Sequence, residues 1–367
     1  QNYFIIKKII LGNKMSYRTL EEEIKVLELG LPPQEGDGFI GGRLDPKEAS
    51  LVLVPVPWEA TVSFGQGTAN APDAIRTSSH QLDVENYHYI KPYTAGIAML
   101  ETDKSLHKLS NKARKKALKV IEALEDGTTN KKALKFVNEA SATLNSSVYE
   151  KSLEQIKKGK FVAVVGGDHS CPLGLIKALS DTQTESFGIL HVDAHHDLRE
   201  AYEGFTYSHA SIFYNVMKEC EKVSNLVQVG IRDYSKEEAT RMINYGSKGA
   251  CLYDTLMQSE LASGKSLEEV FAPYINQLPQ NVYLSIDIDG LEPLNCPNTG
   301  TPVPGGLRYG ELEHLIFMIV KAGKNIIGFD LCEVGDSADG WDANVGSRVL
   351  YQLCGALLAS QGKIEYK

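Results

Sequence analysis

The 367-residue sequence has few cysteines and no excess of basic residues. Its six cysteines are scattered, and no C-x-x-C pair occurs, so we expect reduced, mostly buried thiols and no disulfides. The formal net charge of −9 argues against a nucleic-acid-binding surface, which needs a basic face. The same charge is compatible with a cationic substrate, although net charge says little about any one pocket.

The sequence also lacks an apolar run long enough to span a bilayer. Residues 1–14 carry two apolar triplets separated by Lys7 and Lys8, which is too short for a membrane span and has no small-residue cleavage site. We therefore expect no membrane partner and a cytoplasmic location, with Met15 a candidate for the native start. Repeats, low-complexity tracts and a dinucleotide-binding fingerprint are absent as well.

From Leu51 onward, apolar strand patterns alternate with helical patterns, which predicts a three-layer α/β/α fold with a mainly parallel central sheet. We expect residues 1–50 to form an N-terminal extension, with a helix at 16–29 and then a loop, and residues 51–367 to form a single domain. Strands are expected at 51–55, 94–99, 161–165, 188–192, 226–230, 282–286 and 326–331, and helices at 173–179, 237–245, 267–278, 312–322 and 346–358.

Two segments between the first strands need separate treatment. Residues 57–76 form a long polar loop, a type that is usually functional or disordered in compact domains. Residues 105–158 form a highly charged helical insertion. Its basic run at 112–119 could suggest nucleic acid, but acidic residues follow closely and no aromatic residues are interleaved, which favours a solvated helix face.

The apolar run 188–192 is followed at once by Asp193, His195 and Asp197 in a D-x-H-x-D spacing. Because charges on a strand covered on both faces are costly, these residues should lie past its C-terminal end, where open α/β sheets bind ligands. Carboxylate oxygens with an imidazole suit Mn²⁺, Zn²⁺, Ni²⁺ or Fe²⁺. A lone D-x-H-x-D could equally be a solvated loop, so this motif alone does not decide between the two interpretations.

Repetition of the pattern favours metal binding. The run 161–165 leads to His169, and the run 282–286 leads to Asp287 and Asp289. Six mostly anionic ligands are too many for one ion and would repel one another if left unpaired. The sequence therefore predicts a dinuclear site with bridging carboxylates.

Three motifs resemble those of the ureohydrolases, the family that includes arginase and agmatinase: GGDHS at 166–170, DAHHD at 193–197 and SIDIDGLEP at 285–293. The segments at 57–76, 299–306 and 328–334 also look like family segments, so the resemblance runs from about Leu51 to the C-terminus. Glu292 departs from the usual Asp, at a position that is not a ligand. The resemblance implies an arginase-like fold, two divalent metal ions (Mn²⁺ first, Ni²⁺ as alternative) and a homo-oligomer, trimer or hexamer.

The resemblance also implies a role for each residue. One ion would be held by His169, Asp193, Asp197 and Asp287, and the other by Asp193, His195, Asp287 and Asp289. Asp193 and Asp287 would bridge the ions, and Asp197 would also aim the attacking hydroxide through a hydrogen bond. Two metal ions are needed because water is too weak a nucleophile to attack a guanidinium carbon. Two ions about 3.5–4 Å apart lower the pKa of a shared water from 15.7 toward about 7 and so supply hydroxide.

Two further residues are expected to be catalytic. His209 would shuttle a proton to the departing amine, as a histidine of this region does in the family, and the alternative is a surface or packing histidine. Glu333 would pair with the substrate guanidinium, and the alternative is a structural acid at a strand end. His196 is expected to face solvent.

The substrate is less constrained than the reaction. Arginine-specific relatives carry Asn and Asp where this chain has Arg199 and Ser235, which disfavours arginine and leaves an agmatinase-like substrate, free guanidine or formimidoylglutamate. The aromatic residues of the loop, at positions 202, 205 and 207, would shorten the pocket and disfavour agmatine if they point into its mouth. Alternatively, Arg199 pairs with Glu200 or Glu203 and the aromatic rings only pack the loop.

Two readings from other classes remain open at this point. A non-catalytic metal-binding protein could share the fold, although it would not need all six ligands together with His209 and Glu333. A histone-deacetylase-like amidohydrolase has a related architecture, but it would use one metal and lack the two paired-Asp motifs.

Overall fold

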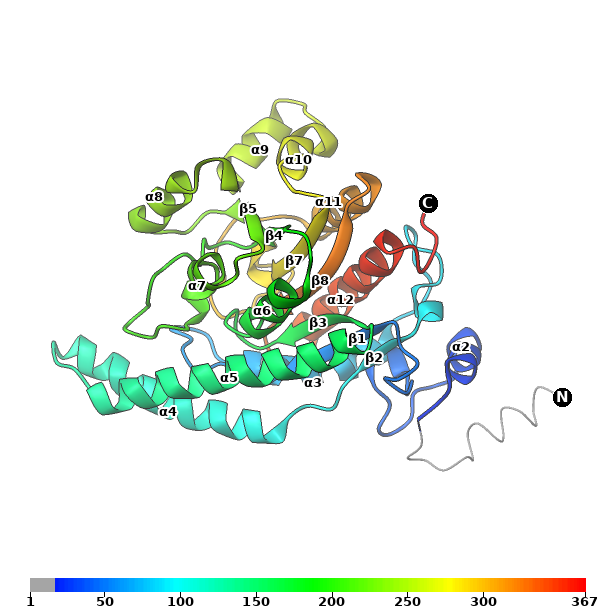
Figure 1. Ribbon diagram of the computed structural model, residues 1–367, viewed down its shortest axis with the longest axis horizontal. Coiled ribbons are helices and arrows are strands. Elements are labelled where there is room, and N and C mark those ends of the chain that lie inside the picture. Colours follow the sequence, from blue (N-terminus) through cyan, green and yellow to red (C-terminus); the bar gives the residue numbers. More distant parts are fainter. Residues whose placement is uncertain (1–16) are drawn as a thin grey trace.

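The computed structural model describes residues 17–367, so the expectations for residues 1–14 and for Ser16 lie outside the described residues. A single eight-stranded sheet forms its centre, in the order β2-β1-β3-β8-β7-β4-β5-β6 (Figure 1). Every neighbouring pair in this sheet is parallel, which confirms the expected sheet type. The strands are β1 Leu51–Val56, β2 Ile97–Met99, β3 Phe161–Gly166, β4 Phe187–Val192, β5 Val223–Ile231, β6 Gly249–Tyr253, β7 Asn281–Asp287 and β8 Asn325–Cys332.

The side chains of each central strand enter two hydrophobic cores, one on each face of the sheet, because successive residues of a strand point to opposite faces. On β3, Ala163 and Val165 enter one core, and Val162 and Val164 enter the other. The first core is covered by α3 Ala71–Ser78, α9 Asp254–Ala262, α10 Leu267–Ile275, α11 Tyr309–Lys321 and α12 Trp341–Ser360. The second is covered by α4 Lys104–Glu125, α5 Lys131–Lys157, α6 Leu173–Thr182, α7 Ile212–Glu219 and α8 Lys236–Asn244. The expected three-layer fold is confirmed.

Several element boundaries differ from the sequence predictions. The edge strand β6 was not predicted, because only Leu252 of its five residues is fully buried and the apolar pattern is weak. The strand expected at 94–99 covers only Ile97–Met99, since Pro92–Ala95 form a 3-10 turn that ends at Gly96 with φ 80°. The polar loop at 57–76 ends earlier than expected, with α3 starting at Ala71.

The N-terminal helix, α2 Leu20–Glu28, begins at a capping box made by Thr19 and Glu22, later than the predicted start at Ser16. All six cysteines are free, five of them buried and Cys251 partly exposed, which confirms the expectation of reduced thiols. Within residues 17–367, no helix combines the length and the apolar character needed to cross a bilayer.

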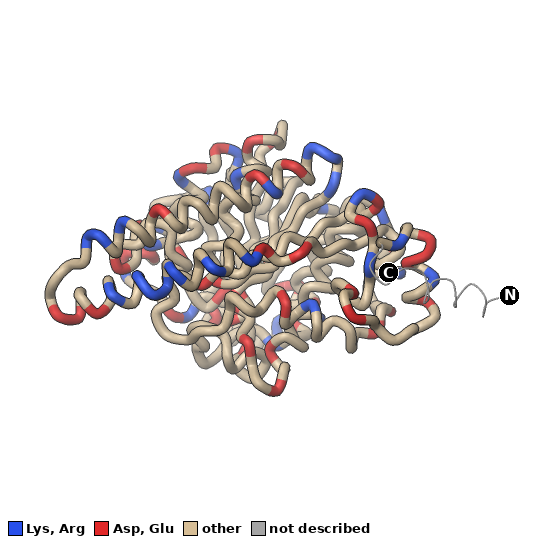
Figure 2. Tube along the Cα trace, turned by 90° about the horizontal axis from the view of Figure 1, so that it is seen from below, with Lys and Arg blue, Asp and Glu red and all other residues tan. Residues whose placement is uncertain are grey.

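The charged stretch at 105–158 forms a hairpin of two long helices, α4 and α5, alongside the second core (Figure 1). Asp103 caps the start of α4 and pairs with Lys151 of α5 at 2.7 Å. The lysines of the basic run are exposed, as expected for a solvated face, and acidic residues are interspersed with basic ones over this surface (Figure 2). Arg114 is the exception, being buried. The proposed boundary at residue 50 stays a prediction.

Candidate metal centre

The four central strands, β3, β8, β7 and β4, are neighbours in the sheet, and each is followed by residues that carry chemistry. His169 follows β3, Glu333 follows β8, Asp287 ends β7, and Asp193 is the first residue after β4. Because all four strands run in parallel, their C-terminal ends meet at one edge of the sheet. Residues up to 164 positions apart in sequence are thereby brought into contact.

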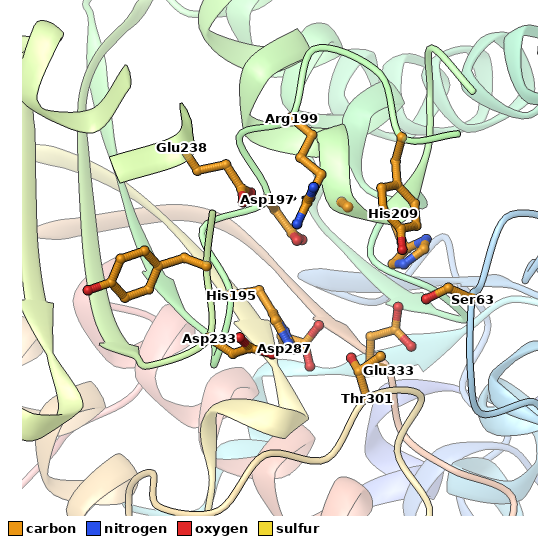
Figure 3. Close-up of a pocket in the computed structure, with 13 residues that line it drawn as sticks. Ser63, His195, Asp197, Arg199, His209, Asp233, Glu238, Asp287, Thr301 and Glu333 are labelled. Atoms are coloured by element: carbon orange, nitrogen blue, oxygen red, sulfur yellow. Dashed lines mark ion pairs between the residues drawn. The ribbon is translucent and has the colours of Figure 1, made fainter. Parts of the chain in front are cut away.

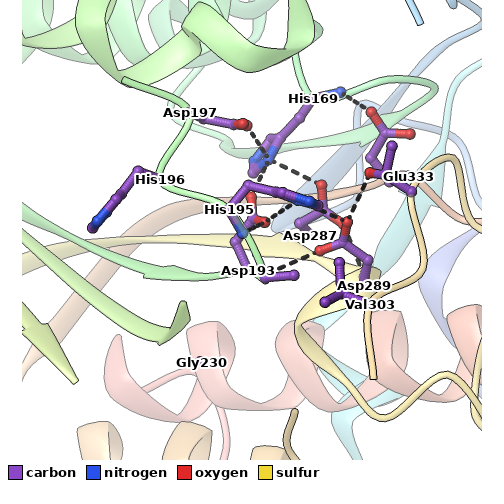
Figure 4. A network of polar contacts seen from close by, with 12 residues as sticks. His169, Asp193, His195, His196, Asp197, Gly230, Asp287, Asp289, Val303 and Glu333 are labelled. Atoms are coloured by element: carbon purple, nitrogen blue, oxygen red, sulfur yellow. Dashed lines mark hydrogen bonds and ion pairs between the residues drawn. The ribbon is translucent and has the colours of Figure 1, made fainter. Parts of the chain in front are cut away.

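Two imidazoles lie at the centre of this edge (Figure 4). His169 Nδ1 lies 3.2 Å from one carboxylate oxygen each of Asp193, Asp197 and Asp287. His195 Nδ1 lies 3.3 Å from Asp193 Oδ1 and 3.1 Å from Asp289 Oδ2. The structure therefore brings together all six residues predicted as ligands, in two groups that share Asp193.

The carboxylates of this cluster are buried, and their pKa values reflect it. Burial, reinforced by the charge of Asp193, raises the pKa of Asp197 to about 7. Burial and neighbouring carboxylates raise the pKa of Asp287 well above its usual range. Although burial opposes it, His191 and His169 hold the pKa of Asp193 well below its usual range. Crowded buried carboxylates repel one another, and a set of oxygen and imidazole donors of this kind fits divalent cations such as Mn²⁺.

A relay behind His169 fixes its orientation. His169 Nε2 lies 2.9 Å from Ser285 Oγ, and that hydroxyl donates to Asp330 Oδ2 at 2.7 Å. Because the Ser285 hydroxyl donates its proton to Asp330, its oxygen can only accept from His169, so Nε2 of His169 carries the hydrogen. Nδ1 of His169 is then unprotonated and faces the carboxylates. Sequence reasoning missed both partners, whose only signal was a polar residue inside an apolar strand. Such outer contacts set the tautomer of a metal-binding histidine.

A second buried relay reaches Asp193 from the other side. Gln228 Nε2 lies 2.8 Å from the carbonyl oxygen of His196 and 2.8 Å from His191 Nδ1, and Gln228 Oε1 lies 2.6 Å from His196 Nδ1. Because a carbonyl can only accept, the amide orientation is fixed and His191 Nδ1 must accept. His191 Nε2 then donates to Asp193 Oδ2 at 2.8 Å, so both of its nitrogens are engaged.

The prediction that His196 faces solvent is wrong. Its side chain is fully buried, between Gln228 and Tyr253, whose hydroxyl lies 3.4 Å from His196 Nε2. The loop after β4 turns back over β5 instead of outward. The sequence signal was a glutamine among the apolar residues of the second half of β5.

The cluster opens into a cavity of ≈ 210 Å³ (Figure 3). The three residues predicted to be catalytic, Asp197, His209 and Glu333, all line this one cavity. The remaining lining residues are Ser63, His195, Arg199, Tyr202, Ala210, Asp233, Tyr234, Glu238, Asp287 and Thr301.

Glu333 presents one free carboxylate oxygen to the cavity. Its Oε1 accepts from the backbone N–H of His169 at 2.9 Å, whereas the buried Oε2 has no hydrogen-bond partner among residues 17–367. Burial, with neighbouring Asp168, raises its pKa well above the usual range. Glu333 and Asp197 also adopt left-handed backbone conformations, with φ of 61° and 53°. For non-glycine residues such strain is typical of functional sites.

His209 begins a 3-10 turn, His209–Ser211, and is held by Thr61 of the loop after β1. Its Nδ1 lies 3.3 Å from Thr61 Oγ1, which also accepts the backbone N–H of His209 at 3.3 Å. Burial is the main cause that lowers the pKa of His209 to about 3. The ring is therefore neutral near pH 7, the form that accepts a proton.

At the mouth, Arg199 Nε lies 3.6 Å from Glu238 Oε2, and its guanidinium carbon lies 5.0 Å from the centre of the Tyr202 ring. The alternative that Arg199 pairs with Glu200 or Glu203 is therefore wrong, since the loop directs the arginine toward α8.

Only one of the three loop aromatic residues lines the cavity. Phe205 is buried against the α4–α5 hairpin, and the Tyr207 hydroxyl lies 3.2 Å from Glu219, which leaves Tyr202 at the mouth. Ser235 is used as the cap of α8, where its hydroxyl donates to Glu238 at 2.8 Å.

Comparison with known proteins identifies the family. The sequence matches the Arginase family over residues 49–355. It is 28% identical over 309 residues to the N(1)-aminopropylagmatine ureohydrolase of Thermus thermophilus (84% of this chain, 90% of that protein). It is 29% identical over 307 residues to the agmatinase of Halalkalibacterium halodurans (83% and 90%).

Two solved structures share the fold. The agmatine ureohydrolase of Thermoplasma volcanium superposes with a TM-score of 0.64 at 20% identity, covering 87% of this chain and 93% of that one. The arginase of Bacillus cereus superposes with a TM-score of 0.57 at 23% identity, covering 83% and 98%. The family match over residues 49–355, which spans most of the sequence, shows that the chain belongs to the arginase family of metal-dependent ureohydrolases.

Proposed function

We propose that this chain hydrolyses a C–N bond of a small guanidino compound and releases urea at a dinuclear metal centre. The observation that carries the proposal is Glu333 Oε2, a buried carboxylate oxygen without a partner among the described residues, in the same cavity as the His/Asp cluster. A guanidinium group satisfies such an oxygen with a charge-assisted hydrogen bond. The His/Asp cluster and the Glu333 carboxylate, which would bind the substrate, thus lie around one reaction volume.

We assign both ions to the six clustered residues. The sharing of Asp193 by the two imidazole-centred groups supports a bridging role for this carboxylate, and His191 is left out because both of its nitrogens are engaged. Mn²⁺ is the first choice and Ni²⁺ the alternative, since both accept oxygen and imidazole donors. The first ion would be held by His169, Asp193, Asp197 and Asp287, and the second by Asp193, His195, Asp287 and Asp289.

The residues of the cavity divide the work of hydrolysis. Two bound ions would supply hydroxide at neutral pH, because metal coordination lowers the pKa of water from 15.7 to about 7. Glu333 holds the guanidinium with its carbon facing the cluster, and Asp197 orients the attacking oxygen by accepting its hydrogen bond. As the C–N bond breaks, His209 passes the proton of the attacking hydroxide to the departing nitrogen, and urea and the amine are the products.

The mouth of the cavity favours a substrate with an amine tail. Asp233 and Tyr234 are exposed there and offer a carboxylate and an aromatic face, both of which attract an ammonium group. The charge of Arg199 lies close to Glu238 and over Tyr202, so it repels such a tail less than an isolated arginine would. The names of the two relatives above, agmatinase and N(1)-aminopropylagmatine ureohydrolase, support the same class.

Urea release tests this proposal at equal metal loading for agmatine, guanidine, 4-guanidinobutyrate and L-arginine. N-formimidoylglutamate has no guanidino group, so its hydrolysis is followed by formamide release, and all five compounds are compared by kcat/KM. We expect agmatine or another guanidino amine to exceed arginine and the two acids. If guanidine is the best substrate, Tyr202 closes the pocket to longer tails and the amine-tail assignment is wrong. If no compound yields urea with Mn²⁺ or Ni²⁺ bound, the hydrolase proposal itself fails.

We also propose a homo-oligomer, trimer or hexamer, in the cytoplasm, without nucleic-acid or membrane partners. These features rest on family resemblance and composition. Size-exclusion chromatography with light scattering tests the oligomeric state, and a purely monomeric active enzyme would contradict it.

A further inference from the structure

His209 lies where two loops meet, and both loops are attached to the α4–α5 hairpin. One loop joins β1 to α3 and carries Thr61, which contacts His209 Nδ1. The other joins β4 to α7 and carries His209 itself. The base of this second loop is closed by backbone hydrogen bonds from Phe213 to Asp197, at 3.1 Å, and from Arg199 to Ala210, at 3.0 Å.

The first loop is attached to α4. The backbone N–H of Glu59 donates to Ser110 Oγ at 3.0 Å, and the buried guanidinium of Arg114 donates from Nη1 to the carbonyl oxygen of Val62. Val62 is adjacent to Thr61 in sequence. Helix α4 therefore fixes the backbone directly beside the residue that contacts His209.

The second loop is attached to α5 through Asn138. Asn138 Oδ1 accepts the backbone N–H of Thr206 at 3.1 Å, and Asn138 Nδ2 donates to the carbonyl oxygen of Gly204 at 3.3 Å. Between these two contacts, the side chain of Phe205 is fully buried among apolar residues of both helices, Ala117, Val120, Ala133 and Val137. One amide thus binds the tip of the loop three residues before His209.

We propose that Asn138 is a positioning residue that sets the place of His209 over the reaction volume. The inference rests on the proposed catalytic role of His209. Asn138 neither lines the cavity nor contacts the His/Asp cluster, so its effect must pass through the loop. Small displacements matter because a catalytic group misplaced by about 1 Å can cost roughly 10²-fold in rate.

The matched pair of variants is Asn138→Ala and Asn145→Ala. Asn145 lies on the same helix, and its side chain makes no hydrogen bond to any of the described residues. We expect Asn138→Ala to lower kcat by roughly 10–10²-fold, with KM and metal content near the wild-type values, and Asn145→Ala to leave all three unchanged. Circular dichroism and thermal unfolding report whether each variant is folded.

A double-mutant cycle separates positioning from a general structural effect. In a His209→Ala background, Asn138→Ala should cause no further loss of kcat, because the group it positions is gone. Asn138→Asp keeps an acceptor for Thr206 N–H and loses the donor to Gly204, so its kcat should lie between wild type and Asn138→Ala. This second variant also serves if Asn138→Ala does not fold.

The outcomes are distinct. If Asn138→Ala retains wild-type kcat, or lowers it by the same factor with and without His209, the positioning role is overturned. If His209→Ala has wild-type kcat, the proposed catalytic role of His209 is wrong. Any loss of kcat in Asn138→Ala must then act through another group on the loop, and the inference about Asn138 is overturned as well.

Discussion

His191 and Gln228 lie opposite each other in the parallel register of β4 and β5, and Gln228 Nε2 donates to His191 Nδ1 at 2.8 Å. This pair is fully buried, one strand residue away from the edge where the carboxylates gather. Two polar side chains at such positions are costly unless every donor and acceptor is matched. Here the chain of hydrogen bonds runs from Gln228 through His191 to Asp193 Oδ2. The pair therefore supports the carboxylate that the two imidazole-centred groups share.

Replacing Gln228 by Glu should weaken metal binding by roughly 10–100-fold, the usual range for a lost outer-shell partner. A carboxylate at this position cannot donate to His191 Nδ1, so the neutral imidazole that supports Asp193 is no longer fixed. Isothermal titration with Mn²⁺ measures the effect. Asn225→Asp, a partly exposed change on the same strand, is the control, and equal affinity in the two variants would refute the relay.

Asp193→Asn should abolish binding of both ions, whereas Asp289→Asn should weaken chiefly one. Asp193 is shared by both groups, but Asp289 contacts only His195 of the two central imidazoles. Elemental analysis of the purified variants gives the stoichiometry. An active wild-type enzyme that holds a single tightly bound metal would rule out the dinuclear assignment.

His209→Asn should lower kcat by roughly 10²–10⁴, the range for a lost general acid or base, without changing metal content. The amide can still accept a hydrogen bond from Thr61 but cannot carry a proton. Steady-state kinetics over pH, with metal analysis of the same sample, tests this. A variant with wild-type kcat at every pH would show that another group transfers the proton.

Glu333→Gln should lower kcat/KM by roughly 10–10²-fold, which corresponds to the 1.5–3 kcal/mol of a hydrogen bond to a charged group. A neutral amide can still accept from the backbone N–H of His169, but it cannot neutralise a guanidinium. Kinetics with the best substrate of the panel measures the loss. Glu292→Gln, a change outside the cavity lining, is the control, and equal effects of the two changes would contradict guanidinium binding by Glu333.

The residues that gather at the sheet edge could be predicted because each follows a readable apolar strand, as Asp193 follows β4. The relays behind them could not, since Ser285 and Gln228 interrupt strands without any local motif. The prediction for His196 was wrong for a related reason. A motif rich in Asp and His suggests exposure to solvent, but the loop folds back against β5. The contact of Asn138 with Gly204 spans 66 positions and depends only on how the hairpin lies on the sheet.

The four strands that supply the cluster are neighbours in the sheet, but two of their three pairings join strands that are distant in the chain. These are β3 with β8 and β7 with β4, whereas β8 pairs with β7, the strand before it. A partly folded chain that lacks β7 and β8 can present the side chains from β3 and β4 but has no Asp287, Asp289 or Glu333. Cation uptake is therefore linked to completion of the whole sheet. A ligand that binds only the folded chain raises the free energy of unfolding by about 2.7 kcal/mol when its concentration is a hundred times its Kd. Chelation should accordingly lower the unfolding temperature of the entire chain in one transition, where a site built on one loop would lose only local order.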